Sequence, residues 1–402
     1  MWNFNKILGI SGWEIVKSQT TSQKIIFYLK QRRKTSNCPR CQRRTKHLYG
    51  YSRLRRIKNG TILGKFCELL IKPRRFKCLN CNLVFNEPLN IVGLYQRTTL
   101  KHKTELIFNL SNQSFHSAAK KYKISYHTQR RWLEQIIKEE VFNFDKEEKE
   151  NKPFVLGIDE VSFAGRDMLT TIGNITKHRL KGVLKSKRKD ELKKILKSLS
   201  PKVKSLIKEV VIDMSDLYKK TVEETLPNAL IVADHFHVIQ DANRRLEQTR
   251  LFLQEIYKKK IPKYILSKNK ESLKEKEKGL LLMILNQYPE LKMFYQTKER
   301  LRDMYKEKTK EKAKEKLNLI ISTLTSSYDG ELILWGRTLY YWKEPILNYW
   351  NSYSTNGFME GMHNKMKLVK RISFGFKNKQ VFIYKVMLSV LITTLYLQHI
   401  LT

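Results

Sequence analysis

Three aspartates follow short apolar runs in the part of the chain beyond residue 150. Asp159 lies in FVLGIDEVSF, Asp213 ends the run in LIKEVVIDMS, and Asp234 ends the run in ALIVADHFHV. The runs are rich in β-branched residues, and helical stretches precede the second and third, which predicts an α/β sheet with buried strands. A carboxylate at the end of a buried strand is costly unless it binds something, commonly a metal ion. The pattern therefore predicts a metal site with several carboxylates.

A fourth acid, Glu360, occurs late in the chain, in STNGFMEGMHNKMKLVKRISFGF (354–376). Thr355–Gly357 has the composition of a turn, so Glu360 is expected in the first turns of the helix that follows, where it could lean over the edge of the sheet. The same helix then offers cations that could bind phosphates. These cations are Lys365, Lys367, Lys370 and Arg371.

Carboxylates grouped in this way suit the hydrolysis of phosphodiesters by divalent metal ions. One ion activates the attacking oxygen and a second stabilises the leaving oxygen, with the ions about 3.5 to 4 Å apart. Mg²⁺ (or Mn²⁺) prefers carboxylate and water, which explains why the candidates are Asp and Glu. Glu160, next to Asp159, is expected to point to the opposite face of its strand and is not placed in this site.

Four of the five cysteines form two C-x-x-C pairs in the first hundred residues, Cys38 with Cys41 and Cys78 with Cys81. Each pair directs two thiolates at one metal, so the pattern predicts a tetrahedral structural Zn²⁺ site. Two cysteine pairs without a metal are the weaker alternative. Cys67 is expected to be a buried apolar residue of a strand. His47 is expected at the surface, although it could compete as a ligand.

The 36 residues between the two pairs resemble a β-hairpin. Residues 47–57 and 62–72 are rich in strand formers, and Lys58–Gly60 between them contains the Asn-Gly cue for a hairpin turn. The metal would staple a sheet too poor in apolar residues to fold alone. Residues 1–95 are therefore predicted to form a zinc-ribbon-like domain.

The residue pattern of 96–140 is typical of a helix-turn-helix. Ser114–Tyr122 would form the first helix, a turn follows at Lys123-Ile124, and Ser125 would cap the second helix. Gln129 is unusual at a position that normally faces the core of such a motif, and an ordinary helical hairpin is the alternative interpretation. The second helix would enter the major groove by its N-terminal turn. That turn offers Tyr126, His127, Arg130 and Arg131.

The acidic run before Phe154 marks a domain boundary, with residues 141–153 expected as a linker. Asp234 and Glu360 are 126 residues apart, far more than a loop of a compact domain would span. The interval is rich in Lys and Glu, so a helical insertion is predicted at about 241–345. Its tryptophans recur at helical spacing and are expected in the core rather than stacked on flipped bases. They are Trp335, Trp342 and Trp350.

The charge of the chain favours nucleic acid as a partner. The net charge is +41, and residues 1–140 contribute +22 of it, with 29 basic and 7 acidic side chains. The apolar stretch at 381–401 is interrupted by Lys385 and is expected to be a buried helix rather than a membrane span. Without a secretory pattern at the N-terminus, a cytoplasmic protein with no membrane partner is predicted.

The motifs resemble those of the DDE transposases of the insertion-sequence L-three (ISL3) group. GIDE around Asp159, VADHFHV around Asp234 and TNGFMEG around Glu360, with KLVKRISFGFKN after it, carry the resemblance, together with CPRC and RRFKCLNC. It implies a multidomain α+β protein in which 154–402 is an RNase H-like catalytic core with Asp159, Asp234 and Glu360 as catalytic triad. Asp213 matches a recurring aspartate with a structural or accessory role.

The resemblance also implies what such a protein would do. It would bind the terminal inverted repeats of a bacterial insertion sequence in double-stranded DNA, cleave a strand, and join the 3′ hydroxyl to target DNA, as a homodimer or higher oligomer. A non-catalytic zinc and helix-turn-helix DNA-binding regulator is the alternative, which the presence of every acid disfavours. A metal nuclease that cuts without joining would share every catalytic residue.

Overall fold

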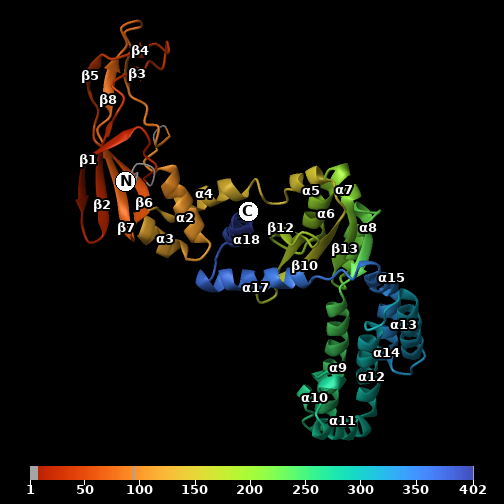
Figure 1. Cartoon of the computed structure of the whole chain (residues 1–402). Coiled ribbons are helices and arrows are strands. Elements are labelled where there is room, and N and C mark those ends of the chain that lie inside the picture. Colours follow the sequence, from red (N-terminus) through yellow and green to blue (C-terminus); the bar gives the residue numbers. More distant parts are fainter. Residues whose placement is uncertain (1–7, 94–95, 402) are drawn as a thin grey trace. The chain divides into compact units, whose positions relative to one another are not determined.

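The computed structural model describes residues 8–93 and 96–401 and separates into two compact units (Figure 1). The first comprises residues 1–139 and 366–402, and the second comprises residues 140–365. This division differs from the expected one, because 1–95 and 96–140 group together and the last 37 residues join them. The boundary passes through helix α17, Gly357–Ile372.

The larger sheet of the first unit has four strands in the order β1-β2-β7-β6. Their bounds are Trp13–Thr20 (β1), Lys24–Gln31 (β2), Arg55–Ile62 (β6) and Lys65–Ile71 (β7). β2 and β7 pair in parallel and the two outer pairs are antiparallel. Trp13, Ile57 and Leu69 are buried in its core, as is Cys67, which agrees with the expectation for that cysteine.

The hairpin between β6 and β7 forms, but the expected turn at Lys58–Gly60 is wrong. The chain turns at Leu63 and Gly64, whose φ angles of 48° and 76° are both positive, as a two-residue hairpin turn prefers. Asn59 and Gly60 lie within β6, where the pairing with β7 is irregular between Lys58 and Thr61. Asn59 is fully buried there and donates to the Leu8 carbonyl at 3.0 Å, so it serves packing rather than turning.

Short strands carry the cysteines at the end of the first unit away from its helices (Figure 1). They are Ser36–Asn37 (β3), Arg44–Thr45 (β4), Leu48–Tyr51 (β5), Arg74–Lys77 (β8) and Val84–Asn86 (β9). β3 pairs with β4, and β5, β8 and β9 form a three-stranded sheet. The core of this region holds only Phe76 and Phe85 beside the cysteines, which leaves little apolar area to stabilise it.

Three helices follow the sheets, namely α2 (Leu100–Leu110), α3 (Phe115–Tyr122) and α4 (Tyr126–Ile137). Ser125 caps α4 as expected, and Ser114 caps α3; each accepts from a backbone N–H three residues on. Gln129 is buried, and its Nε2 donates to the carbonyls of Phe115 and Ile124. The amide therefore ties the two helices and their turn together, which accounts for a polar residue in the core.

Buried hydrogen bonds join the sheet to these helices. The Gly60 N–H donates to Nδ1 of His102 at 2.8 Å, and the Thr61 N–H donates to Glu105 at 3.0 Å. A side chain at Gly60 would collide with Glu105, and the φ of Gly60 is 82°, so glycine is required there. Because β6 and α2 are bonded in this way, the expected zinc and helix-turn-helix regions form one unit.

The His102 contact makes the stability of the first unit depend on pH. Burial lowers the pKa of His102 to about 4, against about 6.5 in an unfolded chain. A depressed pKa means that the stabilisation is present above pH 6.5 and is lost as the pH falls toward 4, by about 3 kcal/mol at most. Thermal unfolding of the wild type should therefore shift down over this range, and His102→Gln should flatten the dependence. Equal pH profiles for the two proteins would contradict the assignment.

The second unit contains a five-stranded sheet in the order β12-β11-β10-β13-β14. The strands are Phe154–Ala164 (β10), Asp167–Asn174 (β11), Arg179–Leu184 (β12), Ile207–Ile212 (β13) and Leu230–Ala233 (β14). β10, β11 and β12 form an antiparallel meander, whereas β13 and β14 run parallel to β10. The three apolar runs of the sequence are thus adjacent parallel strands, and their carboxyl ends meet at one edge.

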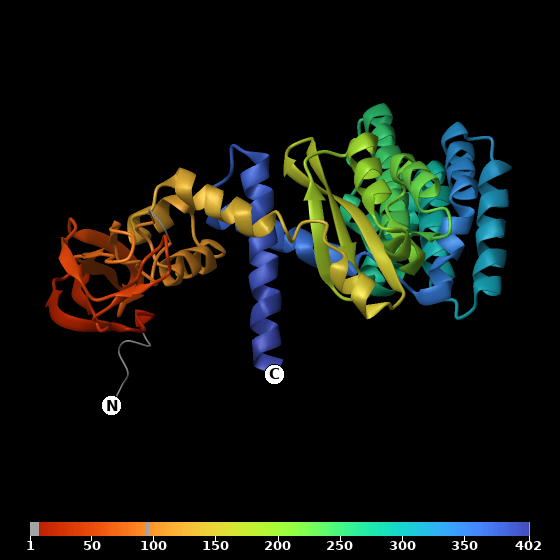
Figure 2. The ribbon, with the colours of Figure 1, turned by 90° about the horizontal axis from the view of Figure 1, so that it is seen from above.

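Helices cover one face of this sheet (Figure 2). They are Lys189–Ser198 (α6), Pro201–Leu206 (α7) and Asp216–Thr225 (α8). The prediction of a linker at 141–153 is wrong. Asp145–Glu150 forms helix α5, and Phe144 before it lies in the core. Buried Glu147 pairs with Lys181 at 2.5 Å. An ion pair and an aromatic anchor hold this acidic segment on the sheet, so its composition did not indicate a free linker.

Between β14 and α17 the described chain is helical and contains no strand. The helices are α9 (His235–Tyr257), α10 (Lys263–Ser267), α11 (Glu275–Gln287), α12 (Pro289–Met304), α13 (Lys310–Thr325), α14 (Gly330–Tyr341), α15 (Lys343–Leu347) and α16 (Tyr349–Ser352), with a 3₁₀ turn at Lys270–Ser272. α9, α12, α13 and α14 lie side by side (Figure 1).

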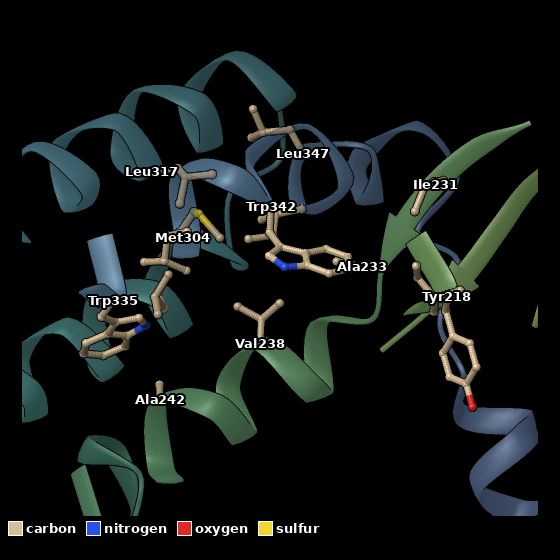
Figure 3. Packing of buried hydrophobic residues seen from close by; sticks show 14 of the residues in the cluster. Tyr218, Ile231, Ala233, Val238, Ala242, Met304, Leu317, Trp335, Trp342 and Leu347 are labelled. Atoms are coloured by element: carbon tan, nitrogen blue, oxygen red, sulfur yellow. The ribbon is translucent and has the colours of Figure 1, made fainter. Parts of the chain in front are cut away.

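The three tryptophans of this insertion are buried, as expected. Trp335 and Trp342 lie in the core with Val238 and Ala242 of α9 (Figure 3), and Trp335 stacks on Phe294 at 5.8 Å between ring centroids. The core is continuous with that of the sheet. The insertion therefore holds α9, and with it the end of β14, in a fixed place.

The last helix, α18 (Lys379–Leu401), belongs to the first unit. Val381, Phe382 and Val386 are buried, in agreement with the expected buried helix, and Lys385 donates to the Gln113 carbonyl at 2.7 Å. In the part of the chain that the structure describes, no helix has the length and apolar character that a membrane crossing requires.

Candidate active site

The sheet brings three aspartates to neighbouring positions. Asp159 lies in β10, Asp213 directly follows β13, and Asp234 follows β14 and precedes the first residue of α9. Asp159 and Asp234 are 6% and 3% exposed, and the Oδ1 atom of Asp213 is buried. Asp159 lies within β10, level with the carboxyl ends of β13 and β14, so neighbouring parallel strands bring the three carboxyl groups close together.

Burial shifts two of these carboxyl groups toward the neutral form. It raises the pKa of Asp159 to about 6 and that of Asp213 to about 7. Negative neighbours add to both shifts, Asp234 for Asp159, and Glu160 and Asp159 for Asp213. The negative charges of these carboxylates therefore repel one another. A cation bound among them would offset this repulsion.

Two histidines that sequence reasoning missed lie among these acids. Nε2 of His237 is 3.8 Å from Asp159 and 3.9 Å from Asp234, and Nδ1 of His363 is 3.8 Å from Asp159. Nε2 of His363 bonds with the Thr171 hydroxyl at 2.9 Å, which fixes its ring. The available signal was spacing, because each histidine follows an expected catalytic acid by three residues, one helical turn.

Two glycines allow α17 to approach the sheet closely. A side chain at Gly157 would meet Asn356 at 2.8 Å, and one at Gly173 would meet Met359 at 2.6 Å. Asn356, just before α17, is buried and donates to the Ile158 carbonyl at 3.3 Å. The glycine before Asp159 in the GIDE motif is thus needed to seat the start of α17 beside the catalytic edge.

The sequence also predicts Glu360 and four cations of this helix at the site. Glu360 is exposed in the first turn of α17, and among the described residues no group of these acids lies within metal-ligand range. Lys365 falls in the second unit, and burial lowers its pKa. The structure assigns the remaining three cations, Lys367, Lys370 and Arg371, to the first unit.

Glu160 takes the position expected of it. It does not join the histidines around Asp159, and instead its carboxylate lies 3.6 Å from Nζ of Lys187. Its backbone N–H donates to Oδ1 of Asp159 at 2.7 Å. Glu160 therefore helps to orient the Asp159 carboxylate through its backbone N–H, while its side chain lies near Lys187.

The donors at this edge fit a divalent cation. Oδ1 of Asp213 and Oδ1 of Asp234 are both buried without a hydrogen-bond donor. Buried carboxylate oxygens without a partner are costly, and hard cations such as Mg²⁺ or Mn²⁺ bind such oxygens. Each of these oxygens is therefore suited to bind such a cation.

The four cysteines of the two C-x-x-C pairs form a second cluster, in the first unit. Their Sγ atoms all lie within 4.8 Å of one another, with Cys38 and Cys81 at 3.5 Å. Tetrahedral Zn²⁺ with bonds of about 2.3 Å would need sulfur separations of about 3.8 Å, so the cluster fits zinc. The backbone N–H of Arg43 chiefly lowers the pKa of Cys41 to about 6, which favours a thiolate ligand. His47 is exposed and outside the cluster.

Comparison with known proteins identifies the class. Residues 156–386 match the family of ISL3-type DDE transposases, described as transposase, and the chain belongs to this family. Membership implies action on DNA and use of a divalent metal.

A relative is known in Bordetella parapertussis. The transposase for insertion sequence element IS1001 is 22% identical over 370 residues, which cover 90% of this chain and 90% of that protein.

Removal of zinc should unfold the cysteine end of the first unit, because Phe76 and Phe85 are its only buried apolar residues beside the cysteines. Cys78→Ser should lose about one zinc ion per chain and the tertiary signals of β5, β8 and β9, whereas Cys67→Ser should keep the metal. Metal analysis and NMR of both variants test this. Full zinc content in Cys78→Ser would contradict the site.

The raised pKa of Asp213 carries a cost in stability. An acid whose pKa is raised by folding destabilises the fold as the pH rises from about 4 through 7. Asp213→Asn should therefore raise the melting temperature at pH 8 by several degrees, on the order of 1 to 3 kcal/mol. Asp190→Asn, at an exposed position, is the control and should change little. An Asp213→Asn protein no more stable than this control would refute the interpretation.

Proposed function

We propose that this chain is the transposase of a bacterial insertion sequence, which binds the terminal inverted repeats of its element and catalyses metal-dependent strand cleavage and strand transfer. The observation that carries the proposal is the set of three aspartates on neighbouring parallel strands, Asp159, Asp213 and Asp234, the first and last of them buried, in a chain of the DDE transposase family. The catalytic carboxylates would be Asp159, Asp234 and Glu360.

The fold assignment rests on the strand order. Three antiparallel strands extended by two strands parallel to the first, with helices on a face and α17 at the edge, support an RNase H-like core. The first acid would then come from the central strand β10. Glu360 would come from α17, which the cradle at Gly157 and Gly173 holds near that strand.

In the proposed reaction, Asp159 and Asp234 hold divalent metal against the scissile phosphate, and Glu360 completes the site when DNA is bound. Bound metal would activate the attacking oxygen and stabilise the leaving oxygen. Water attacks first and the 3′ hydroxyl attacks in the joining step, so no covalent protein intermediate is required. His237 and His363 would orient the carboxylate of Asp159, since both lie 3.8 Å from it.

We also place Asp213 in the site rather than in an accessory role. β13 lies between β10 and β14, and Asp213 follows its last residue, next to the stretch of β10 that carries Asp159. Its Oδ1 is buried without a donor, as is that of Asp234. Both aspartates are therefore candidates for the second metal-binding carboxylate.

The first unit would grip DNA through its helix-turn-helix, with α4 as the helix that enters the major groove. The expected contacts at its N-terminal turn are exposed or half-buried, and they are Tyr126, His127, Arg130 and Arg131. Lys365, Lys367, Lys370 and Arg371 would contact phosphates. The partners would be the repeats and target DNA, bound by a homodimer or higher oligomer that pairs two ends.

Cleavage of duplexes made from the DNA that flanks the gene tests the site. Asp159→Asn, Asp234→Asn and Glu360→Gln should each lower Mg²⁺-dependent cutting at least about 100-fold and leave duplex binding largely intact. Asp213→Asn should lose as much as Asp234→Asn. Asp190→Asn, at an exposed position, is the control and should cut as the wild type does. Undiminished cutting by the three variants of the triad would refute the assignment.

The products separate the alternatives. A transposase should yield joined as well as cut DNA, a nuclease only cut DNA, and a DNA-binding regulator neither. Joined products that vanish in Asp159→Asn would support the proposal. A wild-type chain that binds the flanking DNA but never cuts it would favour the regulator.

A further inference from the structure

A polar groove lies beside α4 within the first unit. It has a volume of about 930 Å³, in the range of ligand-binding pockets. Its walls are residues 90–93 and 96–99, the start of α2, and a side of α4. Its described lining carries three cations, Arg97, Lys103 and Arg131, and no carboxylate. Such a lining is complementary to a polyanion.

The groove shows which side of α4 is available. Gln129, Leu133 and Ile137 are buried against the other helices. Thr128, Arg131 and Gln135, at helical spacing, line the groove instead. Arg131 and Gln135 are exposed there.

A third side of α4 faces α18. The Tyr384 hydroxyl donates to Glu134 at 3.3 Å, and the charge of Arg130 acts on Tyr384. The adjacent arginines Arg130 and Arg131 are thus in different surroundings. Arg130 lies toward α18, with the Glu134 carboxylate four residues on in α4 itself, whereas Arg131 lies in a groove lined by cations.

The groove is also shaped for a chain rather than for a single ion. Nζ of Lys103 lies 5.7 Å from the ring centroid of Trp132, which holds the ammonium beside the groove wall. The neutral lining residues Gln96, Thr98 and Gln135 can donate to phosphate or sugar oxygens. Cations on both walls with hydrogen-bonding groups between them suit a sugar–phosphate backbone.

We propose that this groove seats one sugar–phosphate strand of the duplex that α4 reads. Arg97 from the loop and Lys103 from α2 neutralise successive phosphates, and Arg131 contacts the DNA from α4. This inference rests on the proposed function in that the first unit binds DNA. It sharpens that function, because it assigns the phosphate contacts beside α4 to three residues, Arg97, Lys103 and Arg131.

The salt dependence of DNA binding by the full chain tests the proposal. Affinity is measured between 50 and 200 mM salt for the flanking duplex and for an unrelated duplex of equal length. Each phosphate contact contributes a slope of about 0.9 in log affinity against log salt. Lys103→Ala and Arg97→Gln should each lower the slope by about 0.9 on both duplexes, and Arg131→Ala should do so on the flanking duplex. Lys30→Ala, at an exposed lysine outside the groove, should leave it unchanged.

Unchanged slopes for Lys103→Ala, Arg97→Gln and Arg131→Ala, in a chain whose wild type binds DNA, would overturn the groove proposal and leave the proposed function standing. An equal loss in Lys30→Ala would overturn it as well. A wild-type chain that binds neither duplex would overturn both. Circular dichroism and zinc content of each variant show that the first unit is folded, and Arg97→Gln, in a loop, does not alter a helix.

Discussion

The burial of several carboxyl groups at one edge of a sheet is the constraint around which the second unit is built. Ionised carboxylates repel one another and lose hydration, so Asp159, Asp213 and Asp234 stay there only because rigid elements hold them. Adjacent parallel strands fix their backbone positions. His237 and His363 lie close enough to offset part of their charge. The raised pKa values of Asp159 and Asp213 measure the cost that remains.

Other features of the second unit support this edge. The helical insertion between β14 and α17 buries Trp335 and Trp342 in a core shared with the sheet. Because of this packing, α9 begins at a fixed point after Asp234. Because Gly157 and Gly173 have no side chains, α17 can lie against β10 and β11. The acidic segment before Phe154 closes on the sheet through Glu147 and Lys181.

Periodicity and residue type predicted the parts of this protein that local chemistry decides. The buried strands around Asp159, Asp213 and Asp234, the helix cap Ser125, and the zinc-type cysteine cluster could be read from the sequence alone.

Features that depend on distant partners could not be predicted. The turn of the β6–β7 hairpin moved to Leu63-Gly64 because Asn59 and Gly60 bond to Leu8 and His102. His237 and His363 join the site only through the fold.

The most direct test of the account is Mn²⁺ binding by the full chain, followed by electron paramagnetic resonance. Saturable binding in the wild type that is lost in an Asp159→Asn, Asp234→Asn double variant with unchanged zinc content is the expected result, and equal Mn²⁺ binding by both proteins would contradict the account.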